Sequence, residues 1–168
     1  AELLQYARQW KSTAREVVNQ ALPLAQFFSL LHVTSTYICS PTLVFGPSML
    51  PTLNFSGDVL LVDKLSPLLG MVEPGDIVLV QSPDNPRKNL AKRIMGLEGD
   101  TVTFLADPAR TDRSPQSVVV PKGHVWIQGD NVYASRDSRQ MGPVPYGLIH
   151  GKVIFRVWPP KDFGRLSE

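Results

Sequence analysis

Apolar residues recur every three or four positions through the first twenty residues, and the basic residues fall between them. The apolar stripe consists of Leu3, Ala7, Trp10, Ala14 and Val17. The basic residues Arg8, Lys11 and Arg15 lie off this stripe. The spacing predicts an amphipathic helix over residues 1–20. A short basic helix with a tryptophan suits either a membrane interface or the surface of its own domain.

Residues 21–45 carry no acidic or basic side chain except His32, and most of them are apolar. The stretch is long enough to span a bilayer, because about 20 residues cross the hydrocarbon core. Prolines and hydroxyl-bearing side chains dilute its hydrophobicity, so we expect a membrane anchor that either spans the bilayer or is monotopic. If it spans, the basic residues before it place the N-terminus on the cytoplasmic or matrix side.

Strand-like alternation with a period of two begins after residue 46. Four segments start with a glycine and a polar residue and continue into β-forming residues: 57–62, 75–80, 99–104 and 123–127. Glycine supplies turn conformations, and aspartate bonds to its nearby backbone. Asp58, Asp76 and Asp100 are therefore interpreted as structural residues at strand entries.

Further strands are predicted at 90–97 and 153–158, whereas 105–117 is polar and is interpreted as a loop. Many short strands with turns between them, and no helices alternating with them, predict an all-β barrel or a coiled sheet. We therefore expect a mainly β domain over residues 46–168.

Charge and cysteine content narrow the function classes. The net charge is only +2 and no run of basic residues is present, which argues against nucleic acid as a partner. Cys39 is the single cysteine among 168 residues, so it cannot form an internal disulfide. No Cys/His spacing resembles a zinc site.

Ser48 lies between Pro47 and Pro51, where the charge-free stretch gives way to strand-rich sequence. Prolines fix φ near −65° and remove backbone donors, so the segment predicts a stiff loop that presents the hydroxyl. An ordinary loop has the same pattern, and a nucleophile also needs a base. No Gly-x-Ser-x-Gly elbow is present, and nothing in the placement of the histidines favours a Ser-His-Asp triad.

Lys92 shares a predicted strand face with Leu90 and Ile94. A lysine on an apolar face is costly as a cation and tends to lose its proton. Lowering its pKa from ~10.4 to near neutrality costs roughly 4 kcal/mol at ~1.36 kcal/mol per unit, a large share of a stability of ~5–15 kcal/mol. General-base catalysis explains that cost, since Ser-Lys pairs are a known nucleophile and base. The alternative is a lysine that snorkels at a strand end.

Residues 129–142 form a polar stretch directly after an apolar strand. A hydroxyl such as that of Ser135 could orient a neutral lysine amine. Asp137 and Arg139 have the spacing of a supporting ion pair. By itself the stretch is equally typical of a cluster of Asx and Ser turns.

Together these stretches resemble the type I signal peptidase family of membrane-bound Ser-Lys proteases. Residues 46–53 match its nucleophile motif, residues 92–100 its lysine motif, residues 129–139 its last motif, and Gly57-Asp58 a strand-entry motif. Glu98 stands where proline is common in the family. The resemblance covers the chain from about residue 43 to its C-terminus. It implies a coiled, barrel-like antiparallel sheet with an N-terminal membrane-associated helical segment.

The resemblance also assigns roles. Ser48 would be the nucleophile and neutral Lys92 the general base, with Ser135, Asp137 and Arg139 as supporting residues, and no metal or other cofactor is implied. The Ser48 N–H should be one oxyanion donor, a contact worth ~3–4 kcal/mol. Many bacterial members have a serine at the position of Gly46 as the second donor, and here that donor is unassigned.

Within the family the chain looks most similar to the mitochondrial inner membrane proteases. This implies precursor proteins with cleavable presequences as substrates, a second related protease subunit as partner, and a catalytic domain that faces the intermembrane space. Three alternatives stay open: a signal peptidase of the bacterial or plastid type, a non-catalytic scaffold subunit, and a self-cleaving Ser-Lys regulator. The last is disfavoured because no DNA-binding half or internal Ala-Gly cleavage site is evident.

Overall fold

The computed structural model describes residues 2–105 and 114–166, with backbone only at 2–5, 7–9 and 11–12. The chain divides into two compact units, residues 1–37 and 38–168. Each unit is described separately.

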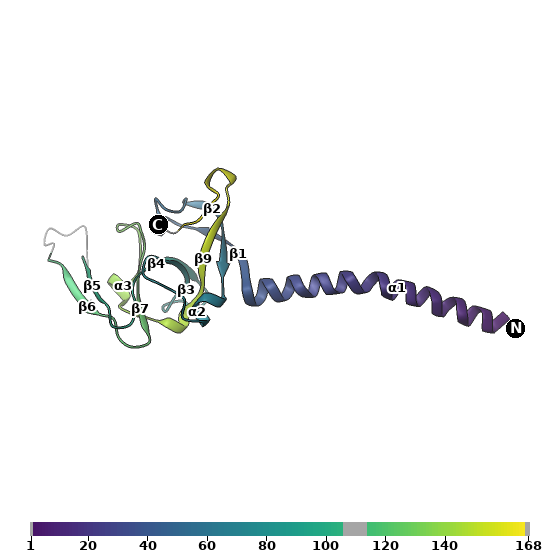
Figure 1. The fold of residues 1–168 in the computed structure, drawn as a ribbon. Coiled ribbons are helices and arrows are strands. Elements are labelled where there is room, and N and C mark those ends of the chain that lie inside the picture. The colour runs from purple at the N-terminus through teal and green to yellow at the C-terminus, as the bar shows by residue number, and fades with distance from the viewer. Residues whose placement is uncertain (1, 106–113, 167–168) are drawn as a thin grey trace. The chain divides into compact units, whose positions relative to one another are not determined.

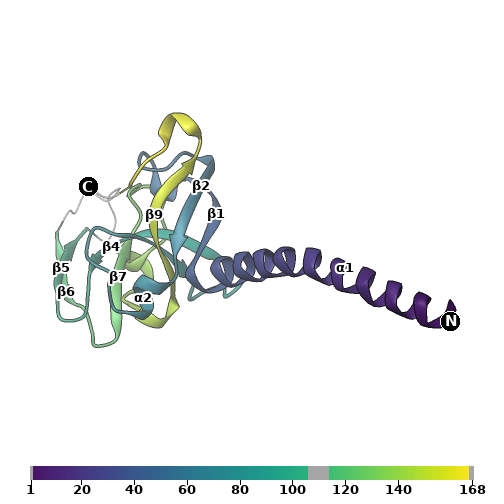
Figure 2. The ribbon, with the colours of Figure 1, turned by 45° about the vertical axis from the view of Figure 1, so that its right-hand side comes forward.

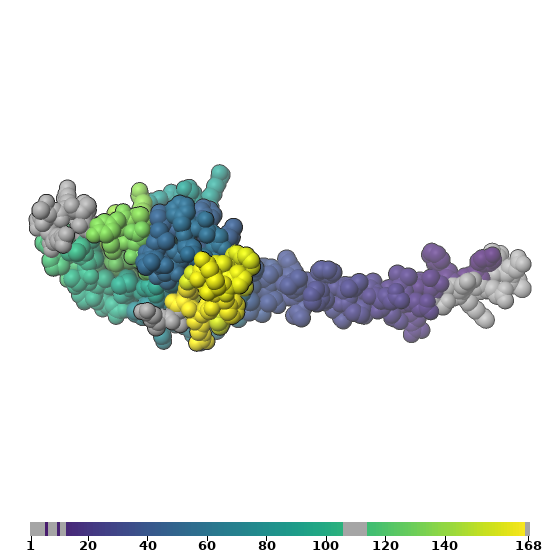
Figure 3. Space-filling view, turned by 90° about the horizontal axis from the view of Figure 1, so that it is seen from above, coloured from purple at the N-terminus to yellow at the C-terminus, as the bar shows by residue number. Residues whose placement is uncertain are grey.

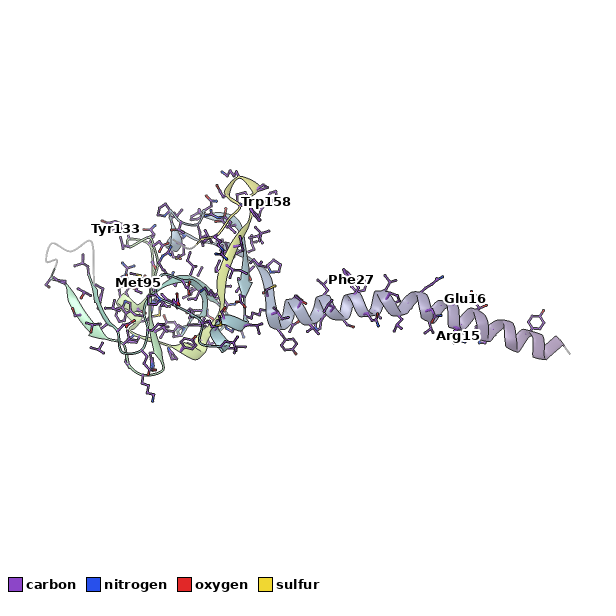
Figure 4. The ribbon with its side chains drawn as sticks, viewed as in Figure 1. Arg15, Glu16, Phe27, Met95, Tyr133 and Trp158 are labelled. Atoms are coloured by element: carbon purple, nitrogen blue, oxygen red, sulfur yellow. The ribbon has the colours of Figure 1, made fainter. Side chains whose placement is uncertain are left out.

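The first unit is a single long helix, α1 (Glu2–Val33), followed by a π-helical turn, Thr34–Ile38 (Figure 1). The helix continues across the expected boundary at residue 20, with Pro23 inside it. Its large apolar side chains are exposed, among them Trp10 and Phe27 (Figure 4). No helix in the described part of the chain is both long and apolar enough to cross a membrane. The membrane anchor over 21–45 stays a prediction.

The second unit is built on a curled antiparallel sheet with the strand order β1-β2-β9-β3-β4-β7-β8 (Figures 1 and 2). Its strands are β1 (Cys39–Phe45), β2 (Ser56–Asp63), β3 (Ile77–Gln81), β4 (Asn89–Gly96), β7 (His124–Gln128), β8 (Val144–Pro145) and β9 (Ile149–Trp158). A separate hairpin pairs β5 (Thr101–Phe104) with β6 (Gln116–Val119). The predicted mainly β fold with a coiled sheet is confirmed.

Short helices lie in the connections between the strands. These are α2 (Leu65–Leu68), α3 (Ser138–Met141) and the 3₁₀ turns Pro47–Met49, Tyr146–Leu148 and Pro160–Asp162. Several strand pairs have register shifts, for example between Ile94 and Gly96 of β4, and such bulges bend a sheet. The C-terminal part of the chain, yellow in Figure 3, lies beside the blue part of the β unit. Arg156 of β9 forms ion pairs with Asp58 and Asp162, at 3.5 and 3.8 Å.

The core lies on both faces of the central strand β3. Val78 and Val80 join one buried apolar cluster, and Ile77 and Leu79 join the other. A strand that is covered on both sides requires a continuous apolar run, which explains why the sequence of β3 does not alternate. The second cluster also contains Met49 and Leu53, so the segment around Ser48 is attached to the core of the sheet.

One boundary differs from the expectation. We expected residues 39–45 to belong to the anchor, but they form β1, which pairs with β2 along its whole length. The compact β unit therefore begins at Ile38 rather than at residue 46. The loop predicted over 105–117 includes the first two residues of β6, which begins at Gln116. Residues 106–113 of this loop lie outside the described part of the chain.

The aspartates at the strand entries are structural, as predicted. Each accepts a hydrogen bond from a backbone N–H of its own turn. The three pairs are Asn54 to Asp58, Glu73 to Asp76 and Leu97 to Asp100, each at 2.8 Å.

Candidate active site

Ser48 lies in a one-turn 3₁₀ helix, Pro47–Met49, that is fixed at both ends. The Gly46 N–H donates to the Phe55 carbonyl at 2.7 Å, and the Leu53 N–H donates to the Met49 carbonyl at 2.9 Å. Gly46 has a φ of 115°, a conformation that favours glycine. Met49 is buried and attaches the turn to the core, whereas Ser48 is half-buried and lies at the surface of the turn.

Lys92 lies in β4 and its residue is only 2% exposed. Burial lowers the pKa of Lys92 to about 8; Asp137 and Asp130 oppose this shift and Arg139 adds to it. Within the described residues, Lys92 Nζ makes no ion pair or hydrogen bond. The strand face deduced from the sequence thus holds a buried lysine whose amine is not occupied by a carboxylate.

The serine and the lysine come from neighbouring elements. The Pro47–Met49 turn lies within 8 Å of β4, measured between Cα atoms. The loop after β7 also contacts this turn, because the Asn131 N–H donates to the Ser48 carbonyl at 3.1 Å. Gly129 of the same loop lies so close to the Ser48 carbonyl and to Ser135 Oγ that a Cβ at this position would overlap both. One loop therefore connects the backbone of Ser48 with Ser135.

Asp137 is the buried centre of that loop. Its carboxylate accepts hydrogen bonds from the Gly129 N–H at 2.8 Å and from Ser135 Oγ at 2.6 Å. Arg139 adds a bidentate pair from Nε at 2.9 Å and Nη2 at 2.7 Å. Burial alone raises the pKa of Asp137, but the hydrogen bonds from Arg139, Gly129 and Ser135 outweigh it, so the pKa lies below its ordinary value.

This network fixes the polarity of the Ser135 hydroxyl. Because its proton is donated to Asp137, the Oγ lone pairs can accept a hydrogen bond from an amine. The capping box of α3 holds Asp137 in place, with the Gln140 side chain accepting from the Asp137 N–H at 2.9 Å. The predicted ion pair of Asp137 with Arg139 is present at 2.7 Å.

A second ion pair was not found from the sequence. Arg93 Nε and Nη2 donate to the two oxygens of Asp130, at 2.9 and 2.8 Å. The pair connects β4, next to Lys92, with the loop that contacts Ser48. Arg93 is also held by the Gly75 carbonyl at 2.7 Å. The two residues are 37 positions apart, and only the β4–β7 register, in which Arg93 faces Gln128, brings them together.

A groove of about 130 Å³ opens beside Ser48, between β1 and the start of β4. β1 is an edge strand of the sheet, so the backbone on its outer side is unpaired. The groove is lined by residues 42–46, 48, 49, 53, 54, 79 and 89–91. It has the form of a site for an extended peptide.

The part of the chain that the structure describes contains no group of three or more His, Cys, Asp or Glu that could hold a metal ion. The chemistry available at the groove is a serine hydroxyl, a buried amine of lowered pKa, and a hydroxyl fixed by an anionic network. These are the parts of a nucleophile, a base and a group that orients the base.

Comparison with known proteins identifies the family of the chain. Residues 15–110 and 106–158 match the family model of signal peptidase, peptidase S26. The mitochondrial ATP-independent inner membrane protease subunit 1a of Arabidopsis thaliana is 58% identical over 97% of this chain and 96% of its own length. The mitochondrial inner membrane protease subunit 1 of Xenopus tropicalis is 44% identical, with 92% of each chain covered.

A protein named as a different subunit is also similar. The mitochondrial inner membrane protease subunit 2 of Mus musculus is 37% identical over 84% of this chain and 82% of its own. The family model and the relatives cover both the serine turn and the lysine strand. The chain therefore belongs to the signal peptidase family, peptidase S26.

Proposed function

We propose that the chain is a serine endopeptidase of the mitochondrial inner membrane that removes targeting peptides from precursor proteins, with Ser48 as the nucleophile and Lys92 as the general base. The observation that carries the proposal is the amine of Lys92, which is buried and free of ion pairs next to the turn that presents Ser48. The names of the similar proteins support the location in the mitochondrial inner membrane.

Acylation begins when neutral Lys92 Nζ takes the proton of Ser48 Oγ as that oxygen attacks the scissile carbonyl carbon. The tetrahedral intermediate collapses, the C–N bond breaks, and the lysine ammonium gives its proton to the leaving amine. The leaving amine is the new N-terminus of the mature protein. The targeting peptide stays on Ser48 as an ester.

Deacylation uses the same base. Lys92 takes a proton from a water molecule, the hydroxide attacks the ester carbonyl, and the C–Oγ bond breaks. Ser48 recovers its proton from Lys92 and the targeting peptide leaves as a carboxylic acid. A pKa of about 8 suits both directions of proton transfer, because a substantial fraction of the amine is neutral at mildly alkaline pH.

Ser135, Asp137 and Arg139 are positioning residues in this proposal. Asp137 accepts a hydrogen bond from Ser135 and stays a carboxylate because Arg139 pairs with it. The Ser135 Oγ lone pairs are then proposed to accept a hydrogen bond from the lysine amine. The Ser48 N–H is the proposed oxyanion donor. The Gly46 N–H already donates to the Phe55 carbonyl and is not available as a second donor.

The substrate is proposed to lie in the groove as an extended strand against the free edge of β1, with its scissile carbonyl at Ser48. Residues 21–37 include the second half of α1, and we propose them as the membrane-associated segment, without the residues that form β1. The basic residues before it favour a catalytic unit in the intermembrane space. Similarity to a subunit 2 protein supports a related protease subunit as a partner.

Two substitutions test the mechanism. Ser48→Ala and Lys92→Met should each abolish cleavage of a presequence-bearing precursor, while circular dichroism shows an unchanged fold. Lys122→Met, at an exposed lysine outside the groove, is the matched control and should cleave like the parent protein. Near-normal processing by the Lys92→Met protein would refute the Ser-Lys mechanism. If the parent chain cleaves no precursor, even together with a subunit 2 protein, the proposed protease activity is rejected in favour of the scaffold alternative.

A further inference from the structure

A second pocket lies beside the loop that contacts Ser48. It has a volume of about 390 Å³ and shares no lining residue with the groove at Ser48. One wall comes from the β5 end of the hairpin, with Thr103, Phe104 and Leu105. The other comes from the end of β7 and the following loop, with Gln128, Val132 and Tyr133, together with Arg139.

The loop between the two sites is short. Asn131 donates its N–H to the Ser48 carbonyl, and the next two residues, Val132 and Tyr133, line the second pocket. Gln128 of β7 pairs with Arg93 of β4, which points to the opposite strand face from its neighbour Lys92. The two pockets are therefore built from different sets of elements: β1 and the start of β4 for the first, and β5, β7 and the following loop for the second.

The polar groups of the second pocket favour an uncharged ligand. Arg139 points its Nε and Nη2 at Asp137 and its Nη1 at the Val132 carbonyl, so its charge is already satisfied. The Gln128 amide has no hydrogen-bond partner among the described residues and can pair with a peptide backbone. Tyr133 lines the pocket and is 78% exposed, which places it at the rim, and Figure 4 shows it on the loop after β7. An exposed aromatic at the rim of an uncharged pocket suits contact with an apolar side chain.

We infer that this pocket binds the substrate segment that follows the scissile bond, and that it selects an apolar side chain among the first residues of the mature protein. The inference rests on the proposed function. In the inferred binding mode, a peptide in the groove at β1 has its scissile carbonyl at Ser48, and the segment after it passes the 129–133 loop. Asn131 of this loop contacts the Ser48 carbonyl, and its Val132 and Tyr133 line the second pocket.

Kinetics with paired substrates test the inference. Two precursors share every residue before the scissile bond and carry either leucine or aspartate at the second position after it. The parent protein should prefer the leucine substrate, and Tyr133→Ala should reduce kcat/KM for leucine about tenfold, or about 1.4 kcal/mol, while changing the aspartate value little. Leu68→Ala, at an exposed apolar residue of α2 that lines neither pocket, should keep the parent preference. Equal values for both substrates in the parent, or an equal loss for both in Tyr133→Ala, would overturn the inference.

Cross-linking separates this inference from the proposed function, because it needs no turnover. The Ser48→Ala protein is mixed with a precursor peptide that carries benzoylphenylalanine at the second position after the scissile bond. Cross-links mapped to 103–105 or 128–133 support the second pocket. Cross-links confined to 42–46 or 89–91 place that segment in the first groove and refute it. If the parent protein cleaves no precursor but cross-links form at the second pocket, the protease proposal is rejected and the inferred binding site is retained.

Discussion

Gly129 lies against the Ser48 carbonyl so closely that no side chain fits between them. A Cβ at Gly129 would overlap the Ser48 carbonyl oxygen and Ser135 Oγ together. The residue thus sets how near the loop of Ser135 and Asp137 approaches the turn of Ser48. Its N–H, donated to Asp137 at 2.8 Å, fixes the same loop from the other side.

We therefore predict that Gly129→Ala separates the two elements and lowers kcat for precursor cleavage about 100-fold, the cost typical of a 1 Å misplacement at a reacting centre. Gly147→Ala is the matched control, because a Cβ there meets open space. The measurement is steady-state cleavage by both proteins at saturating precursor, which gives kcat. A parent-like kcat in Gly129→Ala would show that the spacing of the loop does not matter for the reaction.

Asp137→Asn should weaken both the fold and the site. Arg139 and Asp137 are 2% and 0% exposed, and removing one charge leaves a buried guanidinium without its partner, at a cost of about 3–5 kcal/mol. The free energy of unfolding, measured in urea, should fall by that amount. The amide has one accepting oxygen where the carboxylate has two, so it cannot accept all the hydrogen bonds that Gly129, Ser135 and Arg139 donate. Because the Ser135 hydroxyl is then held less firmly, kcat should fall in the protein that remains folded.

The exposed ion pair between Asp84 and Arg136 gives the control for this substitution. Asp84→Asn removes the same kind of contact at a position where solvent screens it, so stability and cleavage should stay close to the parent values. Equal losses in the two variants would mean that the burial of Asp137 is not what makes its ion pair important.

Local sequence patterns were sufficient to single out the residues of the candidate site on single strands and turns. Lys92 could be found because a period of two places it with Leu90 and Ile94, and Ser48 because two prolines flank its turn. Both predictions depend on neighbours within a few residues. The Arg93–Asp130 pair depends on the register of β4 against β7, which no local pattern encodes.

β1 was missed for a different reason. No charged residue separates it from α1, so the apolar composition from residue 21 onward hides the change from helix to strand at Val33–Cys39. Its alternation is visible only once β2 is known to be its partner, because one face is then half-buried and the other exposed. The second pocket was missed because its walls come from β5, β7 and Arg139, which are distant in the sequence.

The lowered pKa of Lys92 predicts how activity depends on pH. With a value of about 8, the neutral amine that acts as base increases about tenfold per pH unit below 8 and reaches a plateau above it. We expect kcat/KM for precursor cleavage to rise between pH 6 and 9 with a midpoint near 8. A profile that is flat over this range would contradict a general base with this pKa.

The same pKa predicts a pH-dependent stability difference between the parent and Lys92→Met. The pKa is about 8 in the folded protein and 10.5 in the free side chain, so the unfolded state binds more protons between these values. The free energy of unfolding of the parent should therefore rise with pH through this window. Below pH 8 the Lys92 amine is protonated in both the folded and the unfolded state. Burial of the charged amine then lowers the free energy of unfolding by the full amount of about 3 kcal/mol. Urea unfolding at pH 7 and pH 10 should show Lys92→Met as the more stable protein at pH 7 and a smaller difference at pH 10. A difference independent of pH would mean that Lys92 keeps its ordinary pKa in the folded protein.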